Sequence, residues 1–248
     1  MNTEEVRRKV ETEYNESMSS DKRIAAIAKK KKMSYADASA YASRAGRHMG
    51  EALADSIAED AEEVVITEEE AKALIPAALL LNYRNVVAIA RAAQEAMNED
   101  AAIGLAALVP EFDQRRAAEI AAETAQAFAP QLLIGSCENA SRKVVDDSMK
   151  VNARAHSSAG LRVTVTRIYD GVGLSGGRAC KWCLDRCGTD MSYREAYDKG
   201  AFERHPGCGC ELIYKTSKRV QRQSEWQHNK WEDVSEAQLR VRKEYGLE

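Results

Sequence analysis

The sequence predicts a mainly α protein: an alanine-rich helical body over residues 1–158, a small α+β module over 159–216 and a helical tail over 217–248. Three observations lead to this prediction. Alanine runs through most of the first 130 residues, which favours helices that pack through small side chains. At Gly160 the pattern changes to an alternation of apolar and polar residues. Five of the six cysteines then fall between positions 180 and 210.

Apolar periodicity and proline positions predict the helices of the body. The expected ranges are 3–32 with a break near Ser19 and Ser20, 35–58, 71–98 with an interruption at Pro76, 112–129, and 132–156. Ser34 with Asp37, and Thr67 with Glu70, have the spacing of capping boxes that start two of these helices. The acidic stretch 55–63, which leads to Val64-Val65-Ile66, is expected to be a linker.

Two of these helices have informative faces. The 35–58 helix has a narrow stripe of small residues with Gly46 and Gly50 nearby, so we expect it to pack closely on another helix, with His48 on the surface. The 71–98 helix is the most apolar and is expected to lie in the core. Cys137, on the apolar face of the next helix but one, is interpreted as a buried hydrophobic residue.

The module is predicted to contain strands at 161–169 and 211–214, where β-branched residues alternate with polar ones. Between them, Ser192 and Glu195 cap a short helix that ends near Lys199, and Ser235 with Gln238 caps a helix in the tail.

The cysteine-rich segment predicts a metal site. Cys180-Lys181-Trp182-Cys183 is a Cys-x-x-Cys turn, and a second compact turn follows after 21 residues as His205-Pro206-Gly207-Cys208-Gly209-Cys210. Two such turns can complete a tetrahedron of thiolates and imidazole around one ion, most simply zinc. We find no signal peptide and expect a reducing compartment, where clustered cysteines favour a metal over disulfides.

Six side chains in this segment compete for four positions. Cys180, Cys183 and His205 are taken as ligands, with Cys208 or Cys210 as the fourth. Cys187 lies outside both turns and is interpreted as a packed or semi-exposed thiol; a group of reduced cysteines without an ion is the simpler alternative. Four protein ligands close the site, so it is expected to be structural and not catalytic.

Other functions have little support in the sequence. Gly171-Val172-Gly173-Leu174-Ser175-Gly176 has nucleotide-loop spacing, but it leads into a cysteine turn where a dinucleotide fold needs a helix. We identify no catalytic motif and no apolar run long enough for a membrane span. Residues 161–248 carry 16 Lys and Arg against 13 Asp and Glu, and residues 1–160 carry 20 against 26, a weak signal for nucleic acid.

Several of these residues resemble the carboxy-terminal part of minor head (head-morphogenesis, Mu F-like) proteins of tailed bacteriophages. The resemblance covers roughly residues 130–215 and rests on Arg167, Cys180-Lys181-Trp182-Cys183, Gly188, Tyr197 and His205-Pro206-Gly207-Cys208-Gly209-Cys210. It is specific in the closing motif. Cys187 is an addition to the family's pattern.

The resemblance implies a virion component, present in a few copies near the portal, that acts in head assembly or DNA delivery and passes through the host cytoplasm during assembly. Portal or capsid proteins would then be its partners, and no enzyme activity follows. The alternative is a zinc-knuckle protein that binds nucleic acid, for which the tail supplies basic and aromatic residues: Lys215, Lys218, Arg219, Arg222, Trp226 and Trp231. An aromatic tail of this kind serves equally well for docking on a protein assembly.

Overall fold

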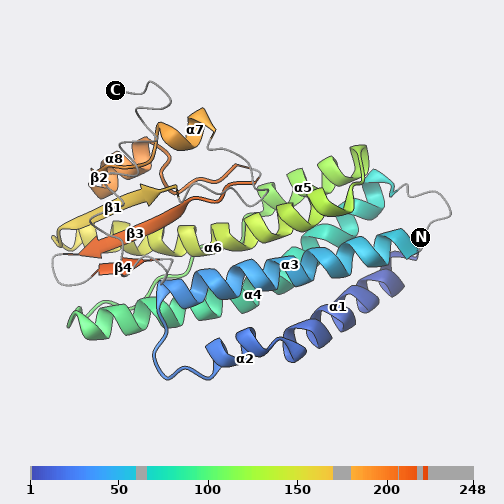
Figure 1. Cartoon of the computed structure of the whole chain (residues 1–248), viewed down its shortest axis with the longest axis horizontal. Coiled ribbons are helices and arrows are strands. Elements are labelled where there is room, and N and C mark those ends of the chain that lie inside the picture. Colours follow the sequence, from blue (N-terminus) through green and yellow to red (C-terminus); the bar gives the residue numbers. More distant parts are fainter. Residues whose placement is uncertain (1, 60–65, 170–179, 206, 217–219, 223–248) are drawn as a thin grey trace.

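The computed structural model describes residues 2–59, 66–169, 180–205, 207–216 and 220–222, the last of these by backbone alone. The described part is mainly helical with a small sheet, as predicted (Figure 1). The helices are α1 (Thr3–Ser20), α2 (Lys22–Ala28), α3 (Tyr35–Glu59), α4 (Glu68–Asp100), α5 (Gln114–Gln126), α6 (Pro130–Ser158), α7 (Lys181–Leu184) and α8 (Tyr193–Asp198). The strands are β1 (Val163–Ile168), β2 (Asp190–Met191), β3 (Glu211–Thr216) and β4 (Val220–Arg222).

The break between α1 and α2 is at Asp21, next to the predicted position. Its carboxylate accepts hydrogen bonds from the backbone N–H groups of Arg23 and Ile24 in the first turn of α2 and pairs with Arg44 at 2.6 Å. His48 of α3 reaches the same carboxylate at 2.9 Å, and its side chain is only 19% exposed. His48 is thus half-buried, less exposed than expected, and it ties α3 to the α1–α2 corner.

Helices α3 and α6 form the closest helix pair of the body. A Cβ atom at Gly46 would lie 2.7 Å from the Cys137 carbonyl oxygen and from the Glu138 Cα, and one at Gly50 would lie 2.5 Å from the Ile134 Cα. Only glycine lets the two backbones approach this closely. The predicted close packing of α3 through small residues is confirmed. The first five residues of the acidic stretch 55–63 belong to α3, and residues 60–63 lie outside the described residues.

Helix α4 runs without interruption through Pro76, so the predicted break there was wrong. Proline removes one backbone hydrogen bond, but buried Leu74, Ile75 and Ala78 on either side hold the helix against its neighbours. By length and composition α4 is the one helix of the described chain that could cross a membrane. It packs on α1, α3, α5 and α6, and the core helix of a soluble protein meets the same criteria.

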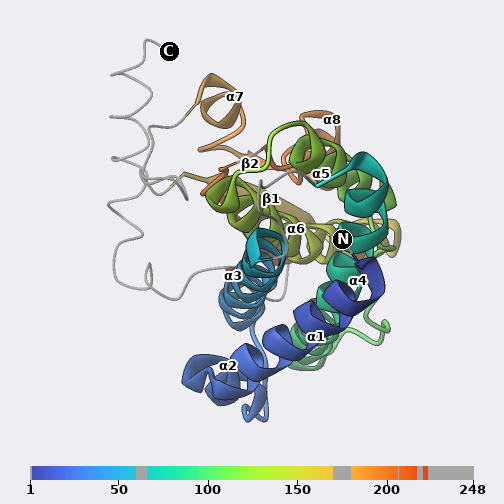
Figure 2. The same ribbon diagram turned by 90° about the vertical axis from the view of Figure 1, so that its right-hand side faces the viewer.

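The sheet has the order β2-β1-β3-β4, and every neighbouring pair is antiparallel. Val165 in the central strand β1 pairs with Met191 on one side and Tyr214 on the other. Strands β1 and β3 and the short capped helix α8 were predicted, whereas β2 and β4 were not. Seen along the long axis, α6 lies between the sheet and helices α3 and α4 (Figure 2).

The body and the sheet share one hydrophobic cluster. Tyr35 of α3, Val145 and Met149 of α6, and Phe202 and Tyr214 of the sheet region all belong to it. The Tyr35 hydroxyl donates to Gln94 of α4, and the Tyr214 hydroxyl contacts His156 of α6. The proposed division at residue 158 stays a prediction, and this shared cluster means that the two parts stabilise each other. Residues 220–222 of the predicted helical tail form strand β4 instead, so the prediction was wrong there; the rest of the tail lies outside the described residues.

Candidate metal centre

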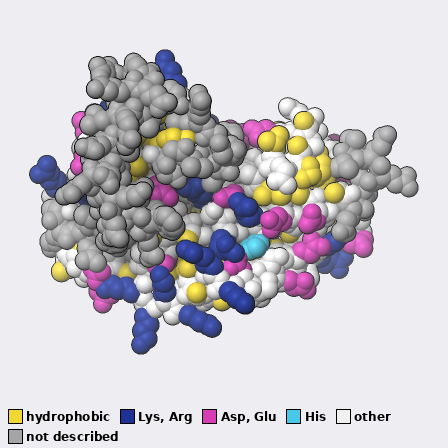
Figure 3. Space-filling view, in the orientation of Figure 1, with side chains coloured by type: hydrophobic (Ala, Val, Ile, Leu, Met, Phe, Trp, Pro, Cys, Tyr) yellow, Lys and Arg dark blue, Asp and Glu magenta, His cyan; other side chains and the backbone are white. Residues whose placement is uncertain are grey.

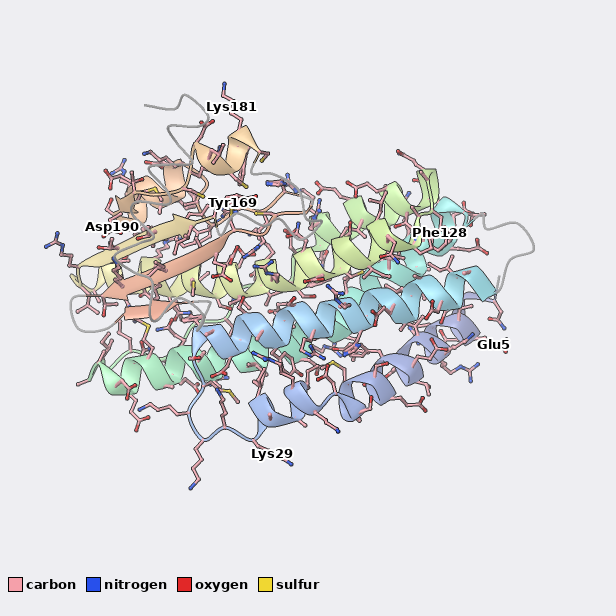
Figure 4. All side chains as sticks on the ribbon, viewed as in Figure 1. Glu5, Lys29, Phe128, Tyr169, Lys181 and Asp190 are labelled. Carbon is pink, nitrogen blue, oxygen red and sulfur yellow. The ribbon has the colours of Figure 1, made fainter. Side chains whose placement is uncertain are left out.

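Two short segments bring cysteine and histidine side chains together beyond one end of the sheet. The first begins at Cys180, which caps α7, and continues to Cys187; α7 lies at the outer edge of the molecule, and Lys181 points away from it (Figure 4). The second runs from His205 to Cys210, directly before β3. The backbone N–H of Gly188, just after the first segment, donates to the Arg167 carbonyl of β1, and β3 pairs with β1, so the two segments are held beside each other.

The first group of donors consists of Cys180, Cys183 and His205. Nε2 of His205 lies 3.3 Å from the Cys180 Sγ and 2.9 Å from the Cys183 Sγ. Cys180 is exposed, Cys183 is buried and His205 is half-buried. These three donor atoms all lie within 4.8 Å of one another, so they could hold a metal ion.

The second group of donors consists of Cys183, Cys208 and Cys210, all buried and again within 4.8 Å of one another. The Sγ atoms of Cys183 and Cys208 are 3.8 Å apart. Cys187 lies beside this group, with its Sγ 3.9 Å from the Cys210 Sγ and only 6% of the residue exposed. Cys183 thus belongs to both groups.

Arg167 of β1 supplies a buried positive charge to the cluster. The residue is 0% exposed, donates to the Ala201 carbonyl and donates to the Cys208 Sγ at 2.9 Å. Burial lowers its pKa, but the negative charge of Cys210 and Cys208 more than offsets this and raises the pKa above its ordinary value. Arg167 also stacks on Trp182, 5.3 Å from the ring centroid, so it stays cationic and well packed.

The thiols are coupled by hydrogen bonds to one another. Hydrogen bonding to Cys208 and Cys210, and then burial, raises the pKa of Cys183. The hydrogen bond to Cys210, followed by burial, raises the pKa of Cys187. Hydrogen bonds donated by Cys183, Cys187 and Cys208 lower the pKa of Cys210. A bound cation would displace the remaining protons.

Side chains of helix α6 contact the backbone carbonyl groups of the second segment. Asn139 donates to the His205 carbonyl at 2.7 Å, and Arg142 contacts the Cys210 carbonyl at 3.5 Å. Arg204 donates to the Cys208 carbonyl at 3.3 Å and pairs with buried Asp146 of α6 at 2.6 Å. These contacts fix the ligand-bearing turn on the helical body.

The structure thus brings together the five predicted ligands: Cys180, Cys183, His205, Cys208 and Cys210. It shows no preference between Cys208 and Cys210, because both lie in the second group. Sequence reasoning set Cys187 aside as a packed or semi-exposed thiol; it is buried, but its sulfur lies against a candidate ligand. Arg167 was noted only for the family resemblance, and its charge at the centre was not predicted. The glycine run 171–176 lies outside the described residues.

The remaining residues singled out in the sequence lie elsewhere. Cys137 is 0% exposed between α3 and α6, as predicted, and burial raises its pKa to about 12. Of the aromatic and basic tail residues, Lys215 pairs with Asp190 of β2, and the side chains of the others lie outside the described residues.

No family model, no curated protein and no solved structure matches this chain.

Proposed function

We propose that the cluster is a structural zinc centre. The observation that carries this proposal is that thiols and one imidazole, most of them buried, come together in two overlapping groups of donor atoms. Thiolate with imidazole is the donor set typical of zinc. Around a tetrahedral ion with Zn–S bonds of about 2.3 Å, sulfur atoms lie about 3.8 Å apart. Cys183 and Cys208 have this separation, at 3.8 Å.

The centre has a stabilising role because its donors fill the coordination positions. A catalytic zinc keeps one position for water or substrate, whereas four protein ligands leave none. The charge is also balanced: three thiolates, neutral His205 and one zinc carry a net charge of −1, and buried Arg167 offsets it. A small sheet with few strands gains stability from such an ion.

We further propose that the protein is a minor head component of a tailed bacteriophage, acting near the portal in head assembly or DNA delivery. The support is the resemblance of its closing motif, together with a helical body to which the centre is fastened by α6. In this role the centre stabilises the chain during assembly, and the body and tail contact portal or capsid protein.

Nucleic-acid binding is the competing proposal, and the four consecutive lysines before α3, Lys29 to Lys32, bear on it. Lys30 pairs with Asp37 at 2.6 Å, and Lys32 pairs with Asp100. Two of the lysines are thus partly neutralised by carboxylates of the body. On the face shown in Figure 3, Lys and Arg side chains are interspersed with Asp and Glu, unlike the continuous basic stripe that phosphate binding favours.

Metal analysis tests the centre. The purified full chain is expected to retain zinc, and Cys180→Ala or His205→Ala is expected to expose the segment after Gly160 to protease, since structural zinc contributes on the order of 10 kcal/mol. The matched control is Cys137→Ala, which removes a buried thiol that packs against α3 and belongs to neither donor group. A folded parent without metal, or a Cys180→Ala variant as resistant to cleavage as the parent, would refute the proposal.

Affinity purification tests the role in the virion. Capture of the tagged chain from prophage-induced cells is expected to recover portal or capsid protein, and Trp226→Ala with Trp231→Ala is expected to weaken that recovery if the tail supplies aromatic anchors. Tight DNA binding that falls steeply between low and physiological salt, without portal or capsid in the captured material, would favour the nucleic-acid proposal instead.

A further inference from the structure

The centre contains more donors than one tetrahedral ion can use. Cys180, Cys183 and His205 form one group, and Cys183, Cys208 and Cys210 form another. Cys187 adds a sixth donor next to Cys210. One zinc would take four of these; with Cys208 as the fourth ligand, it would leave the buried thiols of Cys187 and Cys210, 3.9 Å apart, unused.

We propose that the centre holds two zinc ions that share the thiolates of Cys183 and Cys208. Cys180 and His205 complete the first ion, and Cys187 and Cys210 complete the second. This inference rests on the proposed zinc centre and extends it. Two four-coordinate ions need eight positions, and six donors fill them when two thiolates bridge.

Three donor-to-donor distances fit this assignment. The two bridging sulfurs, Cys183 and Cys208, are 3.8 Å apart, the edge that two tetrahedra would share. The terminal pair of the first ion, Cys180 and His205, is separated by 3.3 Å. The terminal pair of the second ion, Cys187 and Cys210, is separated by 3.9 Å. Each pair has about the separation of two ligands on one ion.

The spacing of the donors along the chain leads to the same arrangement. The first segment is Cys-x-x-Cys-x-x-x-Cys over residues 180–187, and the second is His-x-x-Cys-x-Cys over residues 205–210. In each segment the middle donor is the proposed bridge, and its neighbours on either side belong to different ions. Each segment therefore supplies one bridging thiolate and one terminal ligand to each of the two ions.

The charge of the centre stays balanced with the second ion. Zinc carries two positive charges, and the thiolates of Cys187 and Cys210 bring two negative ones, so the net charge remains −1. The guanidinium of Arg167 donates to the bridging Cys208 at 2.9 Å, where it offsets that charge. The pair Cys187–Cys210 is buried, so its ion would be closed to solvent.

The metal-to-protein ratio of the full chain tests the proposal. Native mass spectrometry and elemental analysis of the zinc-loaded parent are expected to give two ions per chain. Cys187→Ser is expected to lower the ratio to one, whereas Cys137→Ala, the control for loss of a buried thiol, keeps it at two. A ratio of one in the parent would overturn the second site and leave the structural centre standing; a ratio of zero would overturn both.

If Cys187→Ser fails to fold, a measurement on the parent still tests the proposal. Loading with the NMR-active isotope of cadmium is expected to give two resonances of equal intensity, coupled to each other through the shared thiolates. A single resonance, or two without coupling, would overturn the bridged arrangement. So would a disulfide between Cys187 and Cys210, which appears as the loss of two hydrogen atoms in the intact mass.

Discussion

Replacing Asp146 with Asn is expected to destabilise the protein by about 3–5 kcal/mol. The Asp146 side chain is 0% exposed and that of Arg204 only 2%, with the Nε of Arg204 2.6 Å from one carboxylate oxygen. Nη2 of Arg204 donates to the other oxygen at 3.1 Å. The amide keeps the shape of the side chain and removes its charge. A buried guanidinium is then left without its counter-ion, which is the costly case for an ion pair.

A second buried cation raises the expected cost. Burial lowers the pKa of Arg142 to about 10, and the positive charge of Arg204 adds to that shift while Asp146 opposes it. Without the carboxylate, the two guanidinium groups repel each other in a site of low dielectric. Because Arg204 also donates to the Cys208 carbonyl, the ligand-bearing turn is expected to loosen as well.

Urea denaturation of the zinc-loaded protein measures the loss of stability, and the rate of zinc transfer to a chelator measures the loosening of the ligand-bearing turn. The matched control is Asp198→Asn, which removes the same charge from an ion pair with Arg194 whose side chains are 92% and 65% exposed. That variant is expected to lose no more than about 0.5 kcal/mol. A loss below about 1 kcal/mol in Asp146→Asn, with unchanged zinc transfer, would refute the argument.

Three further predictions concern the helical body. Gly46→Ala should lower the free energy of unfolding by about 1–3 kcal/mol through overpacking, whereas Gly135→Ala, where an added Cβ meets nothing within 4 Å, should raise it by up to about 1 kcal/mol; equal effects in urea melts would contradict the close approach of α3 and α6. Burial raises the pKa of Asp21, but hydrogen bonds from His48 and Arg44 outweigh it and hold the pKa below the ordinary 3.8, so its stabilisation is present above that pH and is lost as the pH falls further. Asp21→Asn should therefore flatten the acid limb of the stability curve; an unchanged limb would be the contrary result. With its pKa raised to about 12, Cys137 should resist alkylation at pH 8 in the native protein while exposed Cys180 reacts once zinc is removed, as peptide mass mapping would show.

Local signals in the sequence located most element starts correctly. The pairs Ser34–Asp37, Thr67–Glu70 and Ser192–Glu195 each form the predicted capping hydrogen bonds. A capping box depends only on residues within one helical turn, so tertiary contacts do not disturb it. Strand β1 was also predicted correctly, because its alternation of apolar and polar residues extends over nine residues, 161–169. Strands β2 and β4, with two and three residues, are too short for periodicity to reveal.

The burial of charged residues in α6 could not be predicted from the sequence. Glu138, Arg142 and Asp146 lie four residues apart, a spacing that usually indicates a solvated, charged helix face. All three are buried, because their partners come from distant segments: Glu138 accepts from Arg47 of α3, and Asp146 pairs with Arg204. Only the tertiary arrangement supplies these counter-charges.

The centre was predictable as far as its two motifs reach. Sequence spacing alone identifies the two short turns that can present the ligands Cys180, Cys183, His205, Cys208 and Cys210. Cys187 belongs to neither turn, and its approach to Cys210 depends on the antiparallel pairing of β1 with β3. Arg167 likewise reaches Cys208 only because β1 is central in the sheet.

The two ligand segments are held in different ways, and this sets the order in which they should open without metal. The second segment, around Cys208, is fixed to α6 through the backbone contacts of Asn139 and Arg204. In the first segment, Trp182 stacks on Arg167 of β1, but Cys180, at its start, accepts from the backbone N–H of Cys183, a contact within the segment itself. Zinc therefore does more to hold the first segment than the second. On chelation, limited proteolysis should cut near Cys180 before it cuts between Cys208 and β3; the reverse order would show that α6 does not organise the centre.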